Sequence, residues 1–170
     1  MADDPHIVRT GAMDWAAAWH GRHPFNPASE MRIVRLGGQT GLKQIGVNLI
    51  RIPPGKESFI AHAHSVEEEF VFILEGRGEM ALDGVVHAVG PGDFVGFPTD
   101  GVVHSLLSKG PGDLVYLTGG TNGPVEVADM PSIGKTTLFR RGRMTLFGED
   151  GVESLTQEEW MARTRLPDGT

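Results

Sequence analysis

Two histidines one residue apart are the first feature of this sequence that could carry chemistry. Side chains alternate between the two faces of a β-strand, so His62 and His64 project to the same side, about 7 Å apart along the chain. A turn over residues 65–68 would return Glu69 to their side. Two imidazoles and a carboxylate are suitable metal ligands, and His104 is a fourth candidate that only folding can bring close.

Short apolar runs separated by turn-forming residues must position these side chains. The 24 glycines and 11 prolines are spread between such runs, which is typical of antiparallel strands joined by tight turns. Regularly spaced short strands predict a sandwich or a barrel. The expected strands are Gln44–Ile52, Ser58–His64, Glu69–Leu74, Gly78–Leu82, Val85–Val89, Phe94–Phe97, Val102–Leu107 and Leu114–Leu117.

The chain is expected to form one domain, residues 1–170, with a barrel core over residues 41–120. Residues 1–40 are expected to be an N-terminal arm that wraps around the barrel. The arm contains one helical candidate, Asp14–His20, because Asp14 can cap the first amides and the glycine that follows can end the helix.

The C-terminal tail, residues 121–170, is expected to carry a short helix. Thr156 and Glu159 have the spacing of a capping box and predict an amphipathic helix over Gln157–Arg163 that docks on the barrel. Earlier in the tail, Lys135–Arg143 contains basic residues and no acid. A solvated or salt-bridged face is expected there, and an anion site is the alternative.

Composition excludes several functional classes. Lys and Arg number 15 and Asp and Glu 22, and the net charge of -7 argues against a nucleic-acid partner, which needs a basic face. The absence of cysteine excludes disulfides and thiolate chemistry, so any metal must bind His, Asp or Glu. No apolar stretch approaches the roughly 18 residues of a membrane span, so we expect a soluble, cytoplasmic protein without a membrane partner.

Two blocks of the sequence carry a family resemblance. Gly55–Gly76 reads G, six residues, H-x-H, four residues, E, six residues, G, and Gly92–Ser108 contains G, five residues, P, two residues, G, two residues, H. These blocks resemble the paired motifs of the cupin superfamily. There is one extra residue before His62 and one between Pro98 and Gly101, both in expected turns, and Ser108 stands where the family often has Asn.

The resemblance implies an all-β fold, an antiparallel jelly-roll β-barrel with one divalent metal ion inside. His62, His64, Glu69 and His104 would hold the metal, which could be Mn, Fe, Zn, Ni or Co. Glu67 and Glu68 could also be ligands, but the step of six residues to the motif's last glycine selects Glu69. A barrel that has lost its metal is the alternative. Family habit also implies a homodimer.

The resemblance specifies the function less closely than the fold, since cupin barrels host many activities. The chain is similar to small bacterial cupins described as sugar-phosphate isomerases, which implies a metal-dependent isomerase or lyase acting on a small polar metabolite. Glu69 is the one base that the motifs offer, and Gln44 and Phe97 are expected to contact the substrate. An iron-dependent dioxygenase and a non-catalytic, metal-supported small-molecule binding protein are the alternatives.

Overall fold

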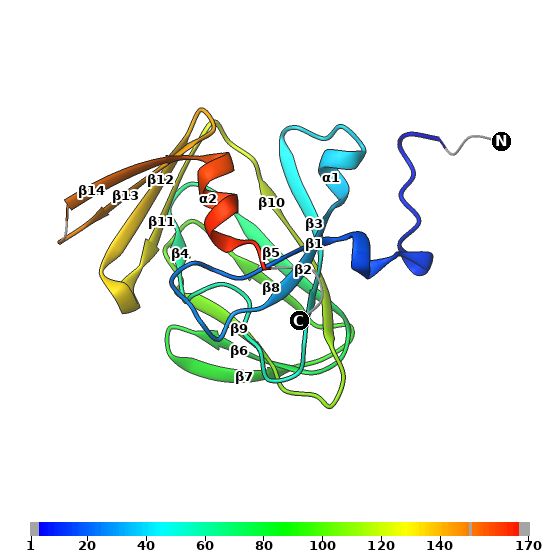
Figure 1. The fold of residues 1–170 in the computed structure, drawn as a ribbon. Helices are drawn as coiled ribbons and strands as arrows, with labels where there is room; N and C mark the ends of the chain where they lie inside the picture. Colours follow the sequence, from blue (N-terminus) through cyan, green and yellow to red (C-terminus); the bar gives the residue numbers. More distant parts are fainter. Residues whose placement is uncertain (1–3, 150, 167–170) are drawn as a thin grey trace.

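The computed structural model of the chain describes residues 4–149 and 151–166. Its largest sheet has six antiparallel strands, which follow one another in space as β1 (Trp19–Gly21), β2 (Met31–Arg35), β3 (Ile45–Ile52), β10 (Leu114–Thr121), β5 (Glu69–Glu75) and β8 (Phe94–Phe97). A second sheet lies across from it and consists of β7 (Val85–Val89), β6 (Gly78–Leu82) and β9 (His104–Ser108) (Figure 1).

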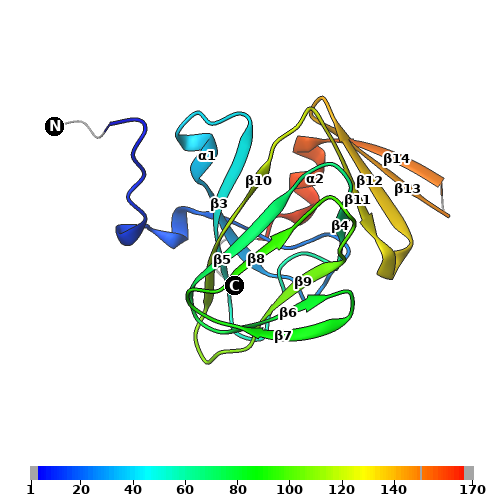
Figure 2. The same ribbon diagram turned by 180° about the vertical axis from the view of Figure 1, so that it is seen from behind.

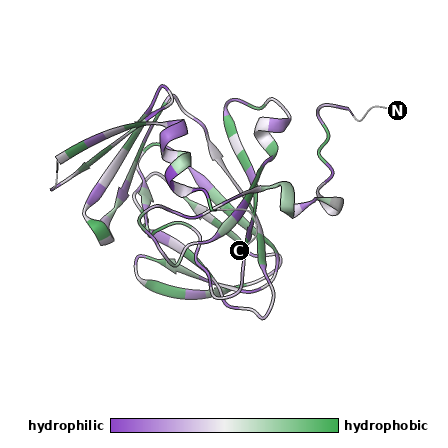
Figure 3. Ribbon diagram, in the orientation of Figure 1, coloured by the Kyte–Doolittle hydropathy of each residue, from purple (hydrophilic) through white to green (hydrophobic). Residues whose placement is uncertain are grey.

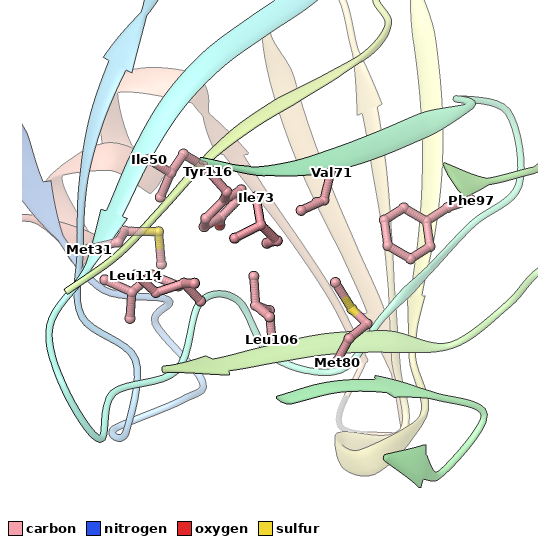
Figure 4. Packing of buried hydrophobic residues seen from close by; sticks show 10 residues of the cluster. Met31, Ile50, Val71, Ile73, Met80, Phe97, Leu106, Leu114 and Tyr116 are labelled. Carbon is pink, nitrogen blue, oxygen red and sulfur yellow. The ribbon is translucent and has the colours of Figure 1, made fainter. Parts of the chain in front are cut away.

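The hydrophobic core fills the space between these two sheets. Hydrophobic and hydrophilic residues alternate along the barrel strands (Figure 3), so each strand turns one apolar side inward. Side chains from both sheets point toward one another in Figure 4. The buried cluster contains Met31, Ile50, Ile52, Val71, Ile73, Met80, Phe97, Leu106, Leu114 and Tyr116. Packing of this kind closes the predicted antiparallel barrel.

A third sheet extends beyond the barrel, as both ribbon views show (Figures 1 and 2). Its spatial order is β14 (Gly151–Thr156), β13 (Arg143–Gly148), β12 (Lys135–Arg140), β11 (Val125–Met130) and β4 (Ala63–His64). The short strand β4 therefore ties the first histidine motif to the C-terminal tail. The basic segment Lys135–Arg143 forms most of the β12–β13 hairpin, and its turn is exposed.

The C-terminal helix is confirmed. It spans α2 (Gln157–Thr164), one residue longer than expected, and its capping box is formed. The backbone N–H of Glu159 donates to the Thr156 hydroxyl at 3.1 Å, and the Glu159 carboxylate accepts from the Thr156 backbone N–H at 2.6 Å. Two orphan amides are thereby satisfied. The helix lies between the third sheet and the β1–β2 side of the barrel (Figure 1).

The N-terminal segment differs from its prediction. Asp14 caps a helix as expected, since its carboxylate accepts from the backbone N–H of Ala16, but that helix is a single 3-10 turn over Trp15–Ala17. The helix predicted over Asp14–His20 is therefore wrong. Residues 19–21 pair with β2 instead, because long-range pairing to a sheet edge outweighs local helix preference. A four-residue helix, α1 (Leu36–Gln39), follows β2.

The strand predicted over Ser58–His64 is regular only at β4. The Ser58 backbone N–H donates to Leu106 and the His62 backbone N–H to His104, so three residues on this side oppose one on β9. The extra residues bulge out of the ladder. This irregularity changes the direction of the chain just before the histidine motif.

The barrel also extends beyond the boundaries drawn from the sequence. β1 and β2 precede residue 41 and join the six-stranded sheet, and β10 continues to Thr121. The first three and last four residues of the expected arm and tail lie outside the described residues. None of the helices within the described ranges is long and apolar enough to cross a membrane.

Candidate metal centre

The structure brings the four predicted ligands together. His62 directly precedes β4, His64 ends it, Glu69 begins β5 and His104 begins β9. One ligand atom from each residue lies within 4.8 Å of all the others. The expected turn over residues 65–68 accounts for the return of the chain, and Nε2 of His64 lies 3.0 Å from a carboxylate oxygen of Glu69.

Backbone pairing joins the two motifs that are far apart in the sequence. The backbone N–H of His62 donates to the carbonyl of His104 at 3.1 Å, and the N–H of His104 donates back at 2.8 Å. Residues directly opposite in an antiparallel pair present their side chains on the same face. The two imidazoles consequently lie side by side, with ring centroids 4.4 Å apart.

Each histidine is oriented by an acceptor at Nδ1. His62 donates to the carbonyl of Ile60 at 2.8 Å and His104 to that of Val102 at 3.0 Å. Carbonyls only accept, so Nδ1 carries the proton in both rings and the Nε2 lone pair stays free for a metal. The ring of His104 is also fixed by Phe97, which stacks on it at 3.8 Å between centroids.

Two residues outside the motifs complete the support of the ligands. Glu126, buried on β11, lies 3.1 Å from Nδ1 of His64 and orients that ring as the carbonyls orient the other two. The hydroxyl of Thr118 on β10 donates to Glu69 at 2.7 Å. Outer contacts of this kind fix the orientation of metal ligands. The sequence pointed to neither residue, since a single acid or threonine within a strand has no motif spacing that marks it.

The electrostatics of the cluster suit a cation. Burial, reinforced by His104, lowers the pKa of His62 to about 3 and keeps its imidazole neutral. Burial acts to raise the pKa of Glu69, but contacts with His104 and His64 outweigh it and hold that pKa far below its ordinary value. A neutral imidazole and an ionised carboxylate are the forms that bind metals.

His64 is the exception within the cluster. Burial lowers its pKa, but the hydrogen bonds and charges of Glu69 and Glu126 prevail and raise it to about 8. An ion that binds Nε2 must therefore displace the proton that this nitrogen shares with Glu69.

The donor set fits a single divalent metal ion. Within the described part of the chain, the buried Nε2 of His104 has no hydrogen-bond partner, although it lies 3.4 Å from Glu69. An unpaired buried nitrogen is unfavourable unless a ligand satisfies it. Three Nε2 atoms and one carboxylate oxygen around a common centre are ligands suited to iron, manganese, nickel, cobalt or zinc.

A cavity of about 410 Å³ opens onto this cluster. Such a volume suits a small-molecule ligand. Its polar lining includes Asn48, Glu67 and Thr118, and burial and the charge of Glu126 raise the pKa of Glu67 to about 7. Its aromatic lining comes from both end regions of the chain and includes Trp19 on β1 and Trp160 on α2.

Neither of the two residues expected to contact substrate lines this cavity. Gln44 precedes β3, its side chain is exposed, and it is not among the residues that line the cavity. Asn48, four residues further along, lines the cavity instead. Phe97 is 2% exposed and belongs to the core, where it supports His104 from behind.

The barrel, its sheet order and this ligand cluster define the class of protein. The cupin domain family matches residues 48–119, which contain all four ligands. The chain belongs to the cupin superfamily, and its fold is the expected antiparallel jelly roll with a short C-terminal helix.

Individual solved structures are also similar to this chain. The chain is 32% identical to a candidate sugar phosphate isomerase from Acidithiobacillus ferrooxidans, with a TM-score of 0.79 over 86% of this chain and 94% of that one. A sugar phosphate isomerase from the cupin superfamily of Silicibacter pomeroyi is 27% identical, with a TM-score of 0.64 over 86% and 92%. The polyketide cyclase RemF from Streptomyces resistomycificus, 18% identical with a TM-score of 0.53 over 69% and 81%, shares the fold alone. No curated protein matches the chain.

Proposed function

We propose that this cupin is a metal-dependent isomerase, or a related lyase, that acts on a small hydroxy-carbonyl metabolite of the sugar or sugar-phosphate type. One observation carries the proposal. Three imidazoles, each held at Nδ1 by an acceptor, direct Nε2 toward Glu69 beside a cavity of small-molecule size. The names of the two relatives at 32% and 27% identity point to the same reaction class.

The chemistry follows from the donor set. A divalent ion held by the four ligands would polarise a substrate carbonyl and stabilise the negative charge that develops when a proton leaves the neighbouring carbon. Asn48, which faces the cavity from β3, would hydrogen-bond a substrate hydroxyl. Trp19 and Trp160 would exclude water and offer an apolar surface to the carbon skeleton.

Glu69 is assigned as a metal ligand in preference to a general base. The sequence suggested it as a base, a role that would require its carboxylate to leave the ion. The hydroxyl of Thr118 holds one of its oxygens at 2.7 Å, and Nε2 of His64 lies 3.0 Å from the other. These contacts stabilise the ionised carboxylate in place, which favours ligation over proton transfer.

Elemental analysis and proton exchange test the proposal together. Protein purified without affinity metals or chelators should contain close to one equivalent of manganese, zinc, cobalt or nickel. Incubated in D2O with aldoses, ketoses and their phosphates, it should exchange the proton next to the carbonyl, as followed by NMR, and His104→Ala should not. Iron with substrate-dependent oxygen uptake would replace the proposal by a dioxygenase. Tight sugar binding without exchange would replace it by a binding protein.

We also propose that the protein is a cytoplasmic homodimer. Phe94 on the edge strand β8 is 66% exposed and stacks on Phe70, so an apolar surface lies at the end of the largest sheet. Exposed apolar patches at sheet edges favour association. Light scattering should give twice the mass of the 18.3 kDa chain, and a monomer mass at micromolar concentration would contradict the dimer.

A further inference from the structure

Two arginines face the metal cavity from the N-terminal part of the chain. Arg35 ends β2 and Arg22 directly follows β1, and both line the cavity that opens onto the ligand cluster. We propose that Arg22 and Arg35 form an anion subsite that binds the phosphate group of the substrate. This inference deepens the proposed function and rests on it, because it names the end of the substrate that lies away from the metal.

Strand register places Arg35 in line with the metal centre. Arg35 lies directly opposite Asn48 on β3, and Asn48 lies opposite Thr118 on β10. Opposite residues share a face, and all three line the cavity. Neighbouring strands are about 4.8 Å apart, so this row spans about 10 Å from Arg35 to Thr118.

The far end of the row touches the candidate metal centre. The hydroxyl of Thr118 donates to Glu69 at 2.7 Å. A ligand that occupies the whole row therefore has its oxygen-rich head at the metal and its other end at Arg35. A short phosphorylated carbon chain has this layout, since its carbonyl and its phosphate lie at opposite ends.

Both guanidinium groups are available for an anion. Among the described residues, neither Arg22 nor Arg35 forms an ion pair with a carboxylate. Among the described residues, the guanidinium of Arg35 donates a hydrogen bond to the sulfur of Met161 on α2, at 3.9 Å. Arginine binds phosphate oxygens with two parallel N–H donors, and Arg22 and Arg35 line one cavity in a protein of net charge -7.

The other basic segment of the chain is a poorer candidate. Arg140, Arg141 and Arg143 lie at the turn of the β12–β13 hairpin, and none of them lines the cavity. Arg143 donates to the hydroxyl of Ser154 on β14. The anion site that the sequence left open for Lys135–Arg143 is therefore assigned to Arg22 and Arg35 instead.

Inorganic phosphate is the probe that isolates this subsite. We would titrate it into metal-stripped full-length protein by calorimetry, so that no bound ion contributes to phosphate binding. The parent should bind phosphate at millimolar concentrations, and Arg22→Gln and Arg35→Gln should each weaken binding by at least about tenfold. Arg35→Lys, which keeps the charge but not the paired donors, should lie between the parent and Arg35→Gln.

Two matched variants control for charge alone. Arg77→Gln alters an exposed arginine in the turn between β5 and β6, and Arg140→Gln alters the rival hairpin. Both should bind phosphate like the parent. A parent that binds no phosphate, cavity variants that bind it normally, or a loss confined to Arg140→Gln would overturn the inference.

A competition experiment distinguishes phosphate from carboxylate. Glucose 6-phosphate should displace phosphate from the parent better than gluconate does, and a preference for gluconate would overturn the phosphate assignment. His104→Ala separates this inference from the proposed function, because it removes a ligand but leaves both arginines in place. If the parent and His104→Ala both bind phosphate but the parent exchanges no proton of any sugar, the isomerase proposal is wrong and the phosphate subsite stands. If exchange occurs and the arginine variants bind phosphate normally, the subsite fails alone.

Discussion

All four candidate ligands lie between residues 62 and 104, whereas much of the remaining lining of the cavity beside them comes from residues 19–35 and 160–164. The ligands are held by short contacts to carbonyls, to Glu126 and to Thr118. These terminal segments contribute aromatic and basic residues to the cavity. On the proposed function, residues 62–104 would supply the groups for chemistry and the two terminal segments would supply the groups for selectivity.

The two regions also differ in how firmly they are held. The candidate ligands adjoin the barrel core, because the core residue Phe97 stacks on His104, and the largest side chains of this core are almost fully buried. Helix α2 has only eight residues and is held by its capping box, by an exposed ion pair between Glu153 and Arg163, and by backbone contacts to β1. Short helices depend on tertiary packing for their stability. Substitutions in the two regions should therefore have separable effects.

The largest expected effect is the loss of a barrel ligand. His104→Ala removes one of three Nε2 donors and should weaken metal binding by more than about 100-fold, so that purified protein contains almost no metal. Folding should be retained. Elemental analysis measures the metal content and circular dichroism measures the folding. His87→Ala, which alters an exposed histidine on β7, is the control. Undiminished metal in His104→Ala would break the ligand assignment.

A pH-dependent effect is expected in the terminal region. Burial lowers the pKa of His23 to about 4, and its ring packs against Phe25, Phe59 and Trp160. The unfolded state, with a pKa near 6.5, binds more protons between pH 6.5 and pH 4, so stability is full above pH 6.5 and falls as the pH falls. The loss attributable to His23 should reach about 3 kcal/mol near pH 4.

Substitution of this residue isolates its contribution. His23→Phe keeps an aromatic ring and cannot titrate, so its free energy of unfolding should fall less between pH 6.5 and pH 4 than that of the parent. Urea denaturation at several pH values measures the difference. Parallel pH profiles for parent and variant would show that the terminal cluster does not respond to acid.

Glu126 tests how sharp the division between the regions is, because it lies on β11, outside the sequence ranges of both, and yet contacts the candidate ligand His64. Glu126→Gln keeps an acceptor for Nδ1 of His64 but removes the charge, and we expect metal affinity to fall by about 10- to 100-fold. Competition with a chelator measures the affinity. Glu75→Gln, at an exposed position of β5, should have no effect. An unchanged affinity in Glu126→Gln would show that Glu126 does not support the metal centre.

The smallest effect is expected on α2. Trp160→Ala removes edge contacts with His23 and Phe25 and should lower the free energy of unfolding by about 1–2 kcal/mol, with metal content unchanged. Thermal unfolding and elemental analysis test both statements. Glu158→Ala, an exposed change on the same helix, is the matched control. Loss of metal from Trp160→Ala would show that packing on α2 affects the metal centre and that the two regions are not separable.

The parts of the fold that were predictable from sequence are those with strong local signals. The strands Gly78–Leu82, Val85–Val89 and Phe94–Phe97 have the expected bounds, since alternating apolar residues end at turn residues. At Gly76 the backbone φ is +82°, and a Cβ would lie 2.3 Å from the Asp113 carbonyl oxygen, so a glycine is required there. The capping box of α2 is also a local pattern.

The parts that failed depend on distant partners. The stretch Asp14–His20 contains residues compatible with a helix, but β1 pairs with β2 instead. The third sheet was missed because β12–β14 mix polar and apolar residues and are only partly buried. Gln44 was assigned to the strand β3, which begins one residue later and leaves that side chain exposed.

The sequence by itself determined the types and the spacing of the four ligands, because H-x-H followed by a turn and a glutamate places three of them together within one short stretch. The tertiary structure decided the rest. It brought His104 beside His62 by backbone pairing and placed Glu126 behind His64. The carbonyls that accept from Nδ1 of His62 and His104 are local, since each lies two residues before its ring. Contacts between residues far apart in the chain are set by strand register and packing, which a local pattern does not encode.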